Sequence, residues 1–300
     1  AHTWSNAQEE EPAEITHGSQ VPTSPLVGLP DGWEPKQTVG GFYSGMSNGQ
    51  VLEDLQINGD VFVTSDGSVS GTPRTGVEIR RCRIMGRIWC GYSGGSPDNV
   101  LIENCEIDGG GSTTDGFIGP GAYTAVRTVM HNGQRGVVAD VNVRLTECWI
   151  YDTFLIEPDA HRSIIGTGYD GPHFNVEVRR CYLDGNPPAG RSGEGLSAIV
   201  VTYDDVSAVG DGAEDWVLED CHVVCGTTLQ VLILSKSGTD TLTNMTFTGN
   251  VFDRDVYEFG GFYGFGTAAP AVSSTWSGNV WGARANGGWS APGTAIPPIW

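Results

Sequence analysis

The chain has 300 residues, of which 44 are Gly and 16 are Pro, and its formal net charge is −20. So acidic a balance excludes a nucleic-acid partner, which requires basic surface, and it disfavours insertion into or binding to anionic membranes. The share of Gly is about twice the average for globular proteins, as a chain rich in turns would need.

Residues 1–45 lack the pattern that organises the rest of the chain. They contain the acidic run Glu9-Glu10-Glu11-Pro12 and a stretch rich in Pro, Ser and Thr. We expect an extended N-terminal arm, part of which caps the first coil, because the open ends of a solenoid need covering. A disordered leader is the alternative.

Residues 46–282 carry a short repeat built around one slot. Each copy reads as an apolar residue, two others, the slot residue, one more residue and a second apolar residue. Eight copies occur at intervals of 23 to 43 residues, and their slots hold Leu55, Cys82, Cys105, Cys148, Cys181, Cys221, Asn250 and Asn279. A unit of this size recurring along a chain predicts a solenoid.

The copies alternate apolar and polar residues, which is the periodicity of β-strands, and many run on into turn residues such as Asn58-Gly59. We therefore predict an all-β, single-domain parallel β-helix solenoid. It should be right-handed, because connections between parallel strands nearly always are. The slot residues should stack inside it about 4.8 Å apart, with Cys as a small apolar filler and Asn pairing its amide with the next coil.

The repeat accounts for the seven cysteines better than a disulfide framework does. An odd number cannot all pair internally, and slot cysteines stacked on parallel strands have poor geometry for a bridge. We expect mostly free, buried thiols, with Cys90 and Cys225 outside the slot, and folding in a reducing cytosol. No signal peptide or membrane span is visible.

Residues 283–300 break the repeat and end in the apolar run Ala295-Ile-Pro-Pro-Ile-Trp300. Left in water, such a tail would expose a large apolar surface. We expect it either to cap the last coil or to dock on a partner subunit, with a homotrimer as one such assembly.

A second strand lies between copies of the repeat and suggests a site. Its copies place a polar side chain at one position of four coils. These are His131, Asp170, Asp204 and Lys236, each five residues after the inward positions Val126, Ile165, Ile199 and Val231. Acids beside a base suit proton transfer, so these four are the candidate catalytic residues. Stacked carboxylates repel, so one pKa should rise unless Lys236 or a cation compensates. Turn residues at strand ends are the alternative.

Nearby side chains are candidates for binding a substrate. They are Tyr169, Tyr203, His161 and Glu194, with the aromatics Trp149 and Tyr151 if these face outward.

The adjacent acids Asp204 and Asp205 are candidates for calcium, which takes six to eight oxygen ligands. No Asp-x-Asp-x-Asp-Gly loop is present, and a solvated acidic loop is the alternative. We expect no cofactor, with calcium as the one alternative.

The segment 25–33, the copy at 51–59 and the Cys and Asn coils together resemble right-handed parallel β-helix proteins of actinobacteria and their phages. That family includes phage minor tail proteins and pectate-lyase-like polysaccharide enzymes. The resemblance covers residues 25–283 and implies the fold, but this fold carries many activities. Related sequences often have His-x-Asp where this chain has His161-Arg162-Ser163, so the expected carboxylate is missing.

The resemblance, the free thiols and the missing carboxylate favour a virion structural and adhesive protein. It would be a phage minor tail protein, folded in the host cytoplasm, that contacts other tail proteins and a host cell-envelope glycan. The acidic surface favours a neutral glycan over a polyanionic one. The alternative is a secreted polysaccharide lyase or glycoside hydrolase acting through the predicted column.

Overall fold

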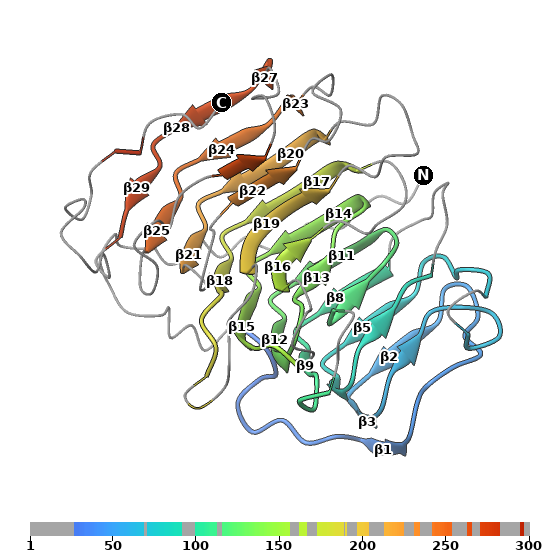
Figure 1. Cartoon of the computed structure of the whole chain (residues 1–300). Coiled ribbons are helices and arrows are strands. Elements are labelled where there is room, and N and C mark those ends of the chain that lie inside the picture. The colour runs from blue at the N-terminus through green and yellow to red at the C-terminus, as the bar shows by residue number, and fades with distance from the viewer. Residues whose placement is uncertain are drawn as a thin grey trace.

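The computed structural model describes residues 27–68, 71–91, 100–112, 116–156, 162–166, 173–188, 190, 197–203, 213–224, 231–234, 242–253, 263–265, 271–282 and 295–296. In these residues the chain coils repeatedly through three parallel sheets. Within each sheet the strands of successive coils stack along one axis, from β1 and β2 at one end to β29 at the other (Figure 1). They contain no helix, and hence no helix that could cross a membrane. The predicted all-β parallel β-helix is confirmed.

Each full coil contributes one strand to each sheet. Sheet A contains β1 (Gln37–Gly40), β3 (Leu55–Asn58), β6 (Arg83–Met85), β9 (Glu106–Asp108), β12 (Val129–Gly133), β15 (Trp149–Thr153), β18 (Tyr182–Asp184), β21 (His222–Val224), β25 (Val251–Asp253) and β29 (Val280–Trp281). Sheet B contains β4 (Val61–Phe62), β7 (Ile88–Trp89), β10 (Ile118–Gly119), β13 (Val137–Val138), β16 (Arg162–Gly166), β19 (Ser197–Tyr203), β22 (Val231–Leu234) and β26 (Tyr263–Phe265).

Sheet C carries the first half of each repeat. It contains β2 (Val51–Glu53), β5 (Glu78–Arg80), β8 (Val100–Glu103), β11 (Tyr123–Val126), β14 (Val141–Thr146), β17 (His173–Arg179), β20 (Ala213–Glu219), β23 (Leu242–Thr243), β24 (Thr246–Thr248), β27 (Ala271–Val272) and β28 (Thr275–Ser277). The slot lies where the chain turns from sheet C into sheet A.

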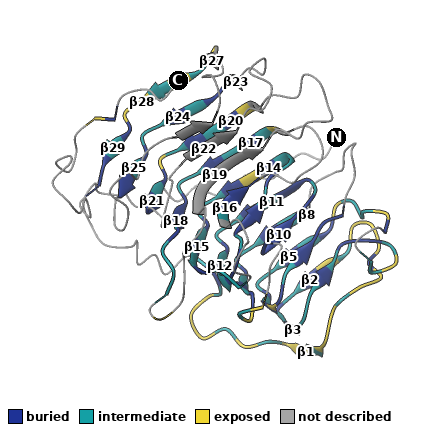
Figure 2. Cartoon of the chain, viewed as in Figure 1, coloured by how far each residue is buried: buried dark blue, intermediate teal, exposed yellow. Residues whose placement is uncertain are grey.

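The slot residues from Cys82 to Asn279 form a buried ladder inside the solenoid, whose strands carry many buried, dark blue residues in Figure 2. Leu55, in the first coil, is only partly buried. The backbone N–H of Cys82 points at the sulfur of Cys105, 3.5 Å away, and that of Cys221 donates to Asn250 Oδ1 at 2.9 Å. Asn250 in turn donates its side-chain amide to Asn279 Oδ1 at 2.8 Å. The five slot cysteines and Cys90 are free and buried, as predicted, and Cys225 lies outside the described residues.

The structure reveals one coil that the repeat analysis missed. Ala125 pairs with Ile102 on one side and Leu145 on the other, which puts Thr128 in the slot between Cys105 and Cys148. Thr128 is fully buried, and its hydroxyl lies 3.5 Å from the backbone N of Cys105. The 43-residue interval is therefore two coils. The copy is concealed because Ala125 is smaller than the apolar residues of the other copies and Thr128 replaces their Cys, Asn or Leu.

The residue before the slot has a left-handed backbone in every coil, with φ between 46° and 69°. These residues are Asp54, Arg81, Asn104, Arg127, Glu147, Arg180, Asp220, Gly249 and Gly278. Left-handed conformations cost non-glycine residues roughly 1–2 kcal/mol, and charge pairs between coils offset part of that cost. Arg81 Nε binds Asp54 Oδ1 at 2.7 Å, and with Lys36 it holds the pKa of Asp54 at about 2.

Both ends of the solenoid carry extra chain. Strand β1, from the predicted arm, pairs with β3 and so forms the first strand of sheet A. At the other end Ala295 forms an antiparallel bridge to Val280, and Ile296 is buried. The indole N–H of Trp276 donates to the carbonyl of Ile296 at 2.8 Å. This part of the tail therefore packs on the last coil.

Candidate functional site

The strand alignment behind the predicted column differs from the one that the described strands adopt. His131 lies in β12 of sheet A, whereas the strands that precede the other three candidates in the chain, β16, β19 and β22, belong to sheet B. The error follows from the missed coil, since Val126 ends β11, a strand of sheet C. The register in sheet B is also shifted by one residue, because Ile165 pairs with Val200 rather than Ile199.

Most of the candidate site residues lie outside the described residues. They are Asp170, Asp204, Asp205, Lys236, Tyr169, His161 and Glu194. Tyr203 is the last residue of β19, where its backbone pairs with Leu234. The roles predicted for all of these candidate residues stay predictions. In the described ranges no group of three or more His, Cys, Asp or Glu side chains is arranged to hold a metal ion.

The described part of the chain does assemble a polar and aromatic face on the outside of sheet A. Inward residues such as Ile107, Met130 and Ile150 alternate with two outward columns. The first column runs Arg83, Glu106, Val129, Trp149, Tyr182 and His222. The second runs Met85, Asp108, His131 and Tyr151. Trp149 and Tyr151 thus face outward, which was the condition for their candidate role in binding a substrate.

His131 is the centre of a connected cluster on this face. Its Nε2 lies 3.3 Å from Glu106 Oε1, and the other oxygen of Glu106 accepts from Arg83 Nε at 2.8 Å. The rings of His131 and Tyr151 stack with their centroids 5.3 Å apart and their planes 13° from parallel. A base, two hydrogen-bonding groups and a flat ring therefore meet on four neighbouring coils.

The cluster shifts the pKa values of its members. Burial by itself lowers the pKa of His131, but the hydrogen bond to Glu106 and the charges of Asp108 and Asp152 outweigh it, so the net pKa is raised. The pKa of Glu106 is lowered, mainly by its hydrogen bond to His131. Burial raises the pKa of Tyr151, and the nearby carboxylates add to that rise. The site therefore favours a protonated imidazole over an ionised phenol.

Replacing Glu106 by Gln should lower the pKa of His131, because the imidazolium loses its main charged partner. A raised histidine pKa stabilises the fold fully below the unfolded value, near 6.5, and that contribution disappears as pH rises through the folded pKa. The melting temperature of the parent should therefore fall over that window, and that of Glu106→Gln should fall less. NMR titration of the imidazole protons measures the shift directly. Glu78→Gln on sheet C is the control, and an unchanged His131 titration in Glu106→Gln would contradict the assignment.

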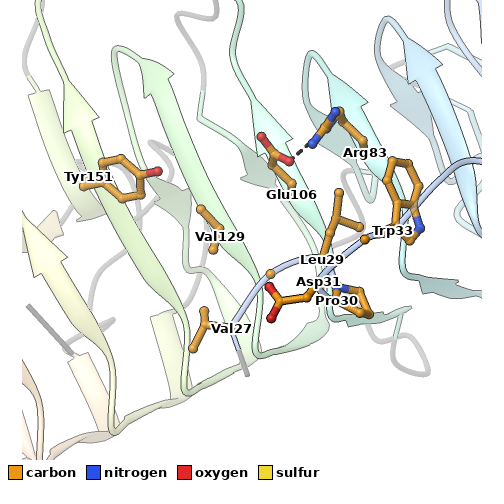
Figure 3. A pocket seen from close by; sticks show the side chains of 11 residues that line it. Val27, Leu29, Pro30, Asp31, Trp33, Arg83, Glu106, Val129 and Tyr151 are labelled. Carbon is orange, nitrogen blue, oxygen red and sulfur yellow. Dashed lines mark hydrogen bonds and ion pairs between the residues drawn. The ribbon is translucent and has the colours of Figure 1, made fainter. Parts of the chain in front are cut away.

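A pocket lies beside the cluster, under the chain segment 27–33, which we call the strap (Figure 3). The pocket has a volume of about 390 Å³. Its walls are Val27, Gly28, Leu29, Pro30, Asp31, Gly32 and Trp33 of the strap, with Arg83, Glu106, Val129 and Tyr151 of sheet A. In Figure 3 the Tyr151 hydroxyl points across the pocket towards Glu106.

The strap is held at both ends. The N–H of Gly28 donates to the carbonyl of Arg127 at 2.8 Å, and the guanidinium of Arg83 lies 5.4 Å above the ring of Trp33. Between them a turn forms where Trp33 N donates to Pro30 O at 3.0 Å. The indole nitrogen of Trp33 is buried without a hydrogen-bond partner. Nothing in the strap's local sequence identified these contacts, because they join residues far apart in the chain.

Farther along sheet A the outer face is closed. His222 Nε2 lies 2.5 Å from Asp253 Oδ2, and the carboxylate of Asp253 is only 3% exposed. Tyr182, which packs edge-on against His222, is likewise 3% exposed. The accessible part of this face therefore ends at β15.

No protein-family model and no curated protein matches the chain. The solved A-module of the mannuronan C-5 epimerase AlgE4 of Azotobacter vinelandii is similar at 15% identity and a TM-score of 0.40, over 84% of this chain and 78% of that one. A mutant tailspike protein of E. coli bacteriophage HK620, in complex with a pentasaccharide, is similar at 12% identity and a TM-score of 0.33. That match covers 82% of this chain and 59% of the tailspike chain, so this chain spans less than two thirds of the tailspike's length. These similarities concern the course of the backbone alone.

Proposed function

We propose that this protein binds a glycan on the outer face of sheet A, in the pocket between the strap and Tyr151. The observation that carries the proposal is the composition of that pocket. It combines two aromatic residues, Trp33 and Tyr151, with the polar groups of Asp31, Arg83 and Glu106. Rings pack on the apolar faces of sugars, while charged groups bond their hydroxyls, and the volume lies in the range of small-molecule sites.

The charge of the site favours a neutral sugar. Carboxylates of Asp31 and Glu106 line the pocket and Asp108 lies nearby, against the single guanidinium of Arg83. The chain as a whole carries −20. A polyanionic glycan would be repelled unless a cation such as calcium bridged it.

We further propose that the glycan belongs to a host cell envelope and that the protein is a phage minor tail protein. Support comes from the family resemblance of the sequence and from the free, buried thiols, which suit folding in a reducing cytosol. Partners would then be other tail proteins, with a homotrimer as one assembly. Negative-stain microscopy of the phage with an antibody against this chain tests the location.

Replacing Tyr151 by Ala should weaken glycan binding by about tenfold or more, because the aromatic wall of the pocket is lost. The measurement is titration calorimetry with whichever neutral oligosaccharide the parent binds on a glycan array. Phe42→Ala is the control, since Phe42 is 65% exposed and away from the pocket. Equal affinities of Tyr151→Ala and the parent would refute the proposed site.

A polysaccharide lyase or glycoside hydrolase is the second candidate function. The observation that favours it is the contact of His131 with Glu106 beside Tyr151, since a titratable pair next to a phenol can move protons. Incubating the bound glycan with the protein, with and without calcium, would reveal new reducing ends or unsaturated sugars. Product that disappears in His131→Ala would establish the enzyme.

A further inference from the structure

The strap follows the same line as the first outward column of sheet A. Gly28 lies against Val129 of β12, Trp33 lies over Arg83 of β6, and the backbone N–H of Lys36 donates to Asp54 O at 2.7 Å. The strap therefore crosses from coil to coil along the solenoid axis, as Figure 3 shows for its passage from Val27 to Trp33. A polymer lying along this column would meet the strap at Val129.

The fit of the strap on the sheet is close. Gly28 has φ of +86°, and a Cβ at this position would lie 2.9 Å from Val129 Cγ2. Only glycine combines that conformation with such an approach. The strap end at Gly28 is thus seated directly on the sheet, which leaves no passage between them for a sugar chain.

The opposite end of the open face is blocked as well. Tyr182 of β18 is 3% exposed, although it is the next residue of the first column after Trp149. Between Val129 of β12, where the strap is seated, and Tyr182 of β18 lie two coil spacings, about 10 Å at roughly 4.8 Å per strand. That is the length of a short oligosaccharide and not of a polymer running through.

From this geometry we infer that the pocket takes the terminal unit of a neutral glycan chain, with the strap as the end wall that excludes internal segments. The inference rests on the glycan-binding function proposed above. It adds the part of the glycan that is bound and the residues that decide it. Asp31 and Glu106 on the pocket wall further disfavour a chain that ends in a uronate.

The test is the number of protein molecules bound per chain. Neutral manno-, galacto-, laminari- and N-acetylated chito-oligosaccharides of three units and of ten or more units are titrated in a calorimeter. An end-binding pocket loads one protein per chain at both lengths, with the same affinity per chain. The same trisaccharide carrying a terminal uronate should bind at least several-fold more weakly.

One variant displaces the wall. Gly28→Val unseats the end of the strap by its clash with Val129 and its left-handed φ. It should raise the loading on the long chains above one. Gly40→Val is the matched control, because an added Cβ meets nothing within 4 Å there. Melting curves of both variants should stay close to the parent, since both positions lie outside the hydrophobic core.

The outcomes separate the two claims. If the parent already loads several proteins per long chain while Tyr151→Ala abolishes binding, the end-wall inference is wrong and the proposed function stands. Uronate ends that bind as well as neutral ends would overturn the neutral assignment. If none of these glycans binds, or Tyr151→Ala binds like the parent, the proposed function fails and the inference fails with it.

Discussion

Replacing Cys148 by Asp should lower the free energy of unfolding by about 3–5 kcal/mol at pH 7, the cost of an uncompensated buried charge. Cys148 is 0% exposed, and its sulfur faces the carbonyl of Ala125 at 3.4 Å. Burial already raises the pKa of its thiol well above the usual range, which shows that this slot disfavours an anion. Urea denaturation followed by circular dichroism measures the loss.

The loss should depend on pH in a definite direction. An aspartate buried in this slot has a folded pKa above its unfolded value of about 3.9, so the damage grows as pH rises above that value and shrinks below it. Cys148→Asn is the matched control. Asn250 already donates its amide to the carbonyl of Leu218 at 2.9 Å, and an Asn at 148 could reach Ala125 O in the same way. Equal stability of the Asp and Asn variants would show that slot 148 is not the dry position described.

Replacing Gly136 by Ala should destabilise the fold by about 3 kcal/mol or more, in the range of severe overpacking. An added Cβ would overlap the carbonyl oxygen of Ile164 and lie 2.7 Å from its carbonyl carbon. Those atoms are backbone of the next coil, so they cannot turn aside as a side chain would. Gly136 also bonds both neighbouring coils, through its N–H to Ser163 O at 2.8 Å and its carbonyl to Phe117 N at 2.6 Å.

The comparison variant is Gly40→Ala in β1, where an added Cβ meets nothing within 4 Å. It should change the melting temperature by no more than about 1 °C, whereas Gly136→Ala should lower it by about 5 °C or more. Both are measured by differential scanning calorimetry. A small effect at Gly136 would mean that the coils at β13 and β16 can move apart at little cost.

The slot ladder could be predicted because its signal is local. Slot residues such as Cys82 and Asn250 recur with the same flanking apolar residues, and each side chain fills the same turn in its own coil. The pattern failed at Thr128, where the slot is filled by a hydroxyl that bonds the backbone carbonyl of Val126 at 3.1 Å. That failure then placed His131 with the wrong neighbours.

By itself, then, the sequence determined the fold class and the buried free thiols, because strand alternation and coil stacking follow from short-range pattern. Only the tertiary structure decided the site. The meeting of Glu106, His131 and Tyr151 depends on which coils are neighbours, and that depends on the length of every loop between them. The strap's seat at Gly28 depends on a contact across about a hundred residues of chain, for which the local sequence carries no physical signal.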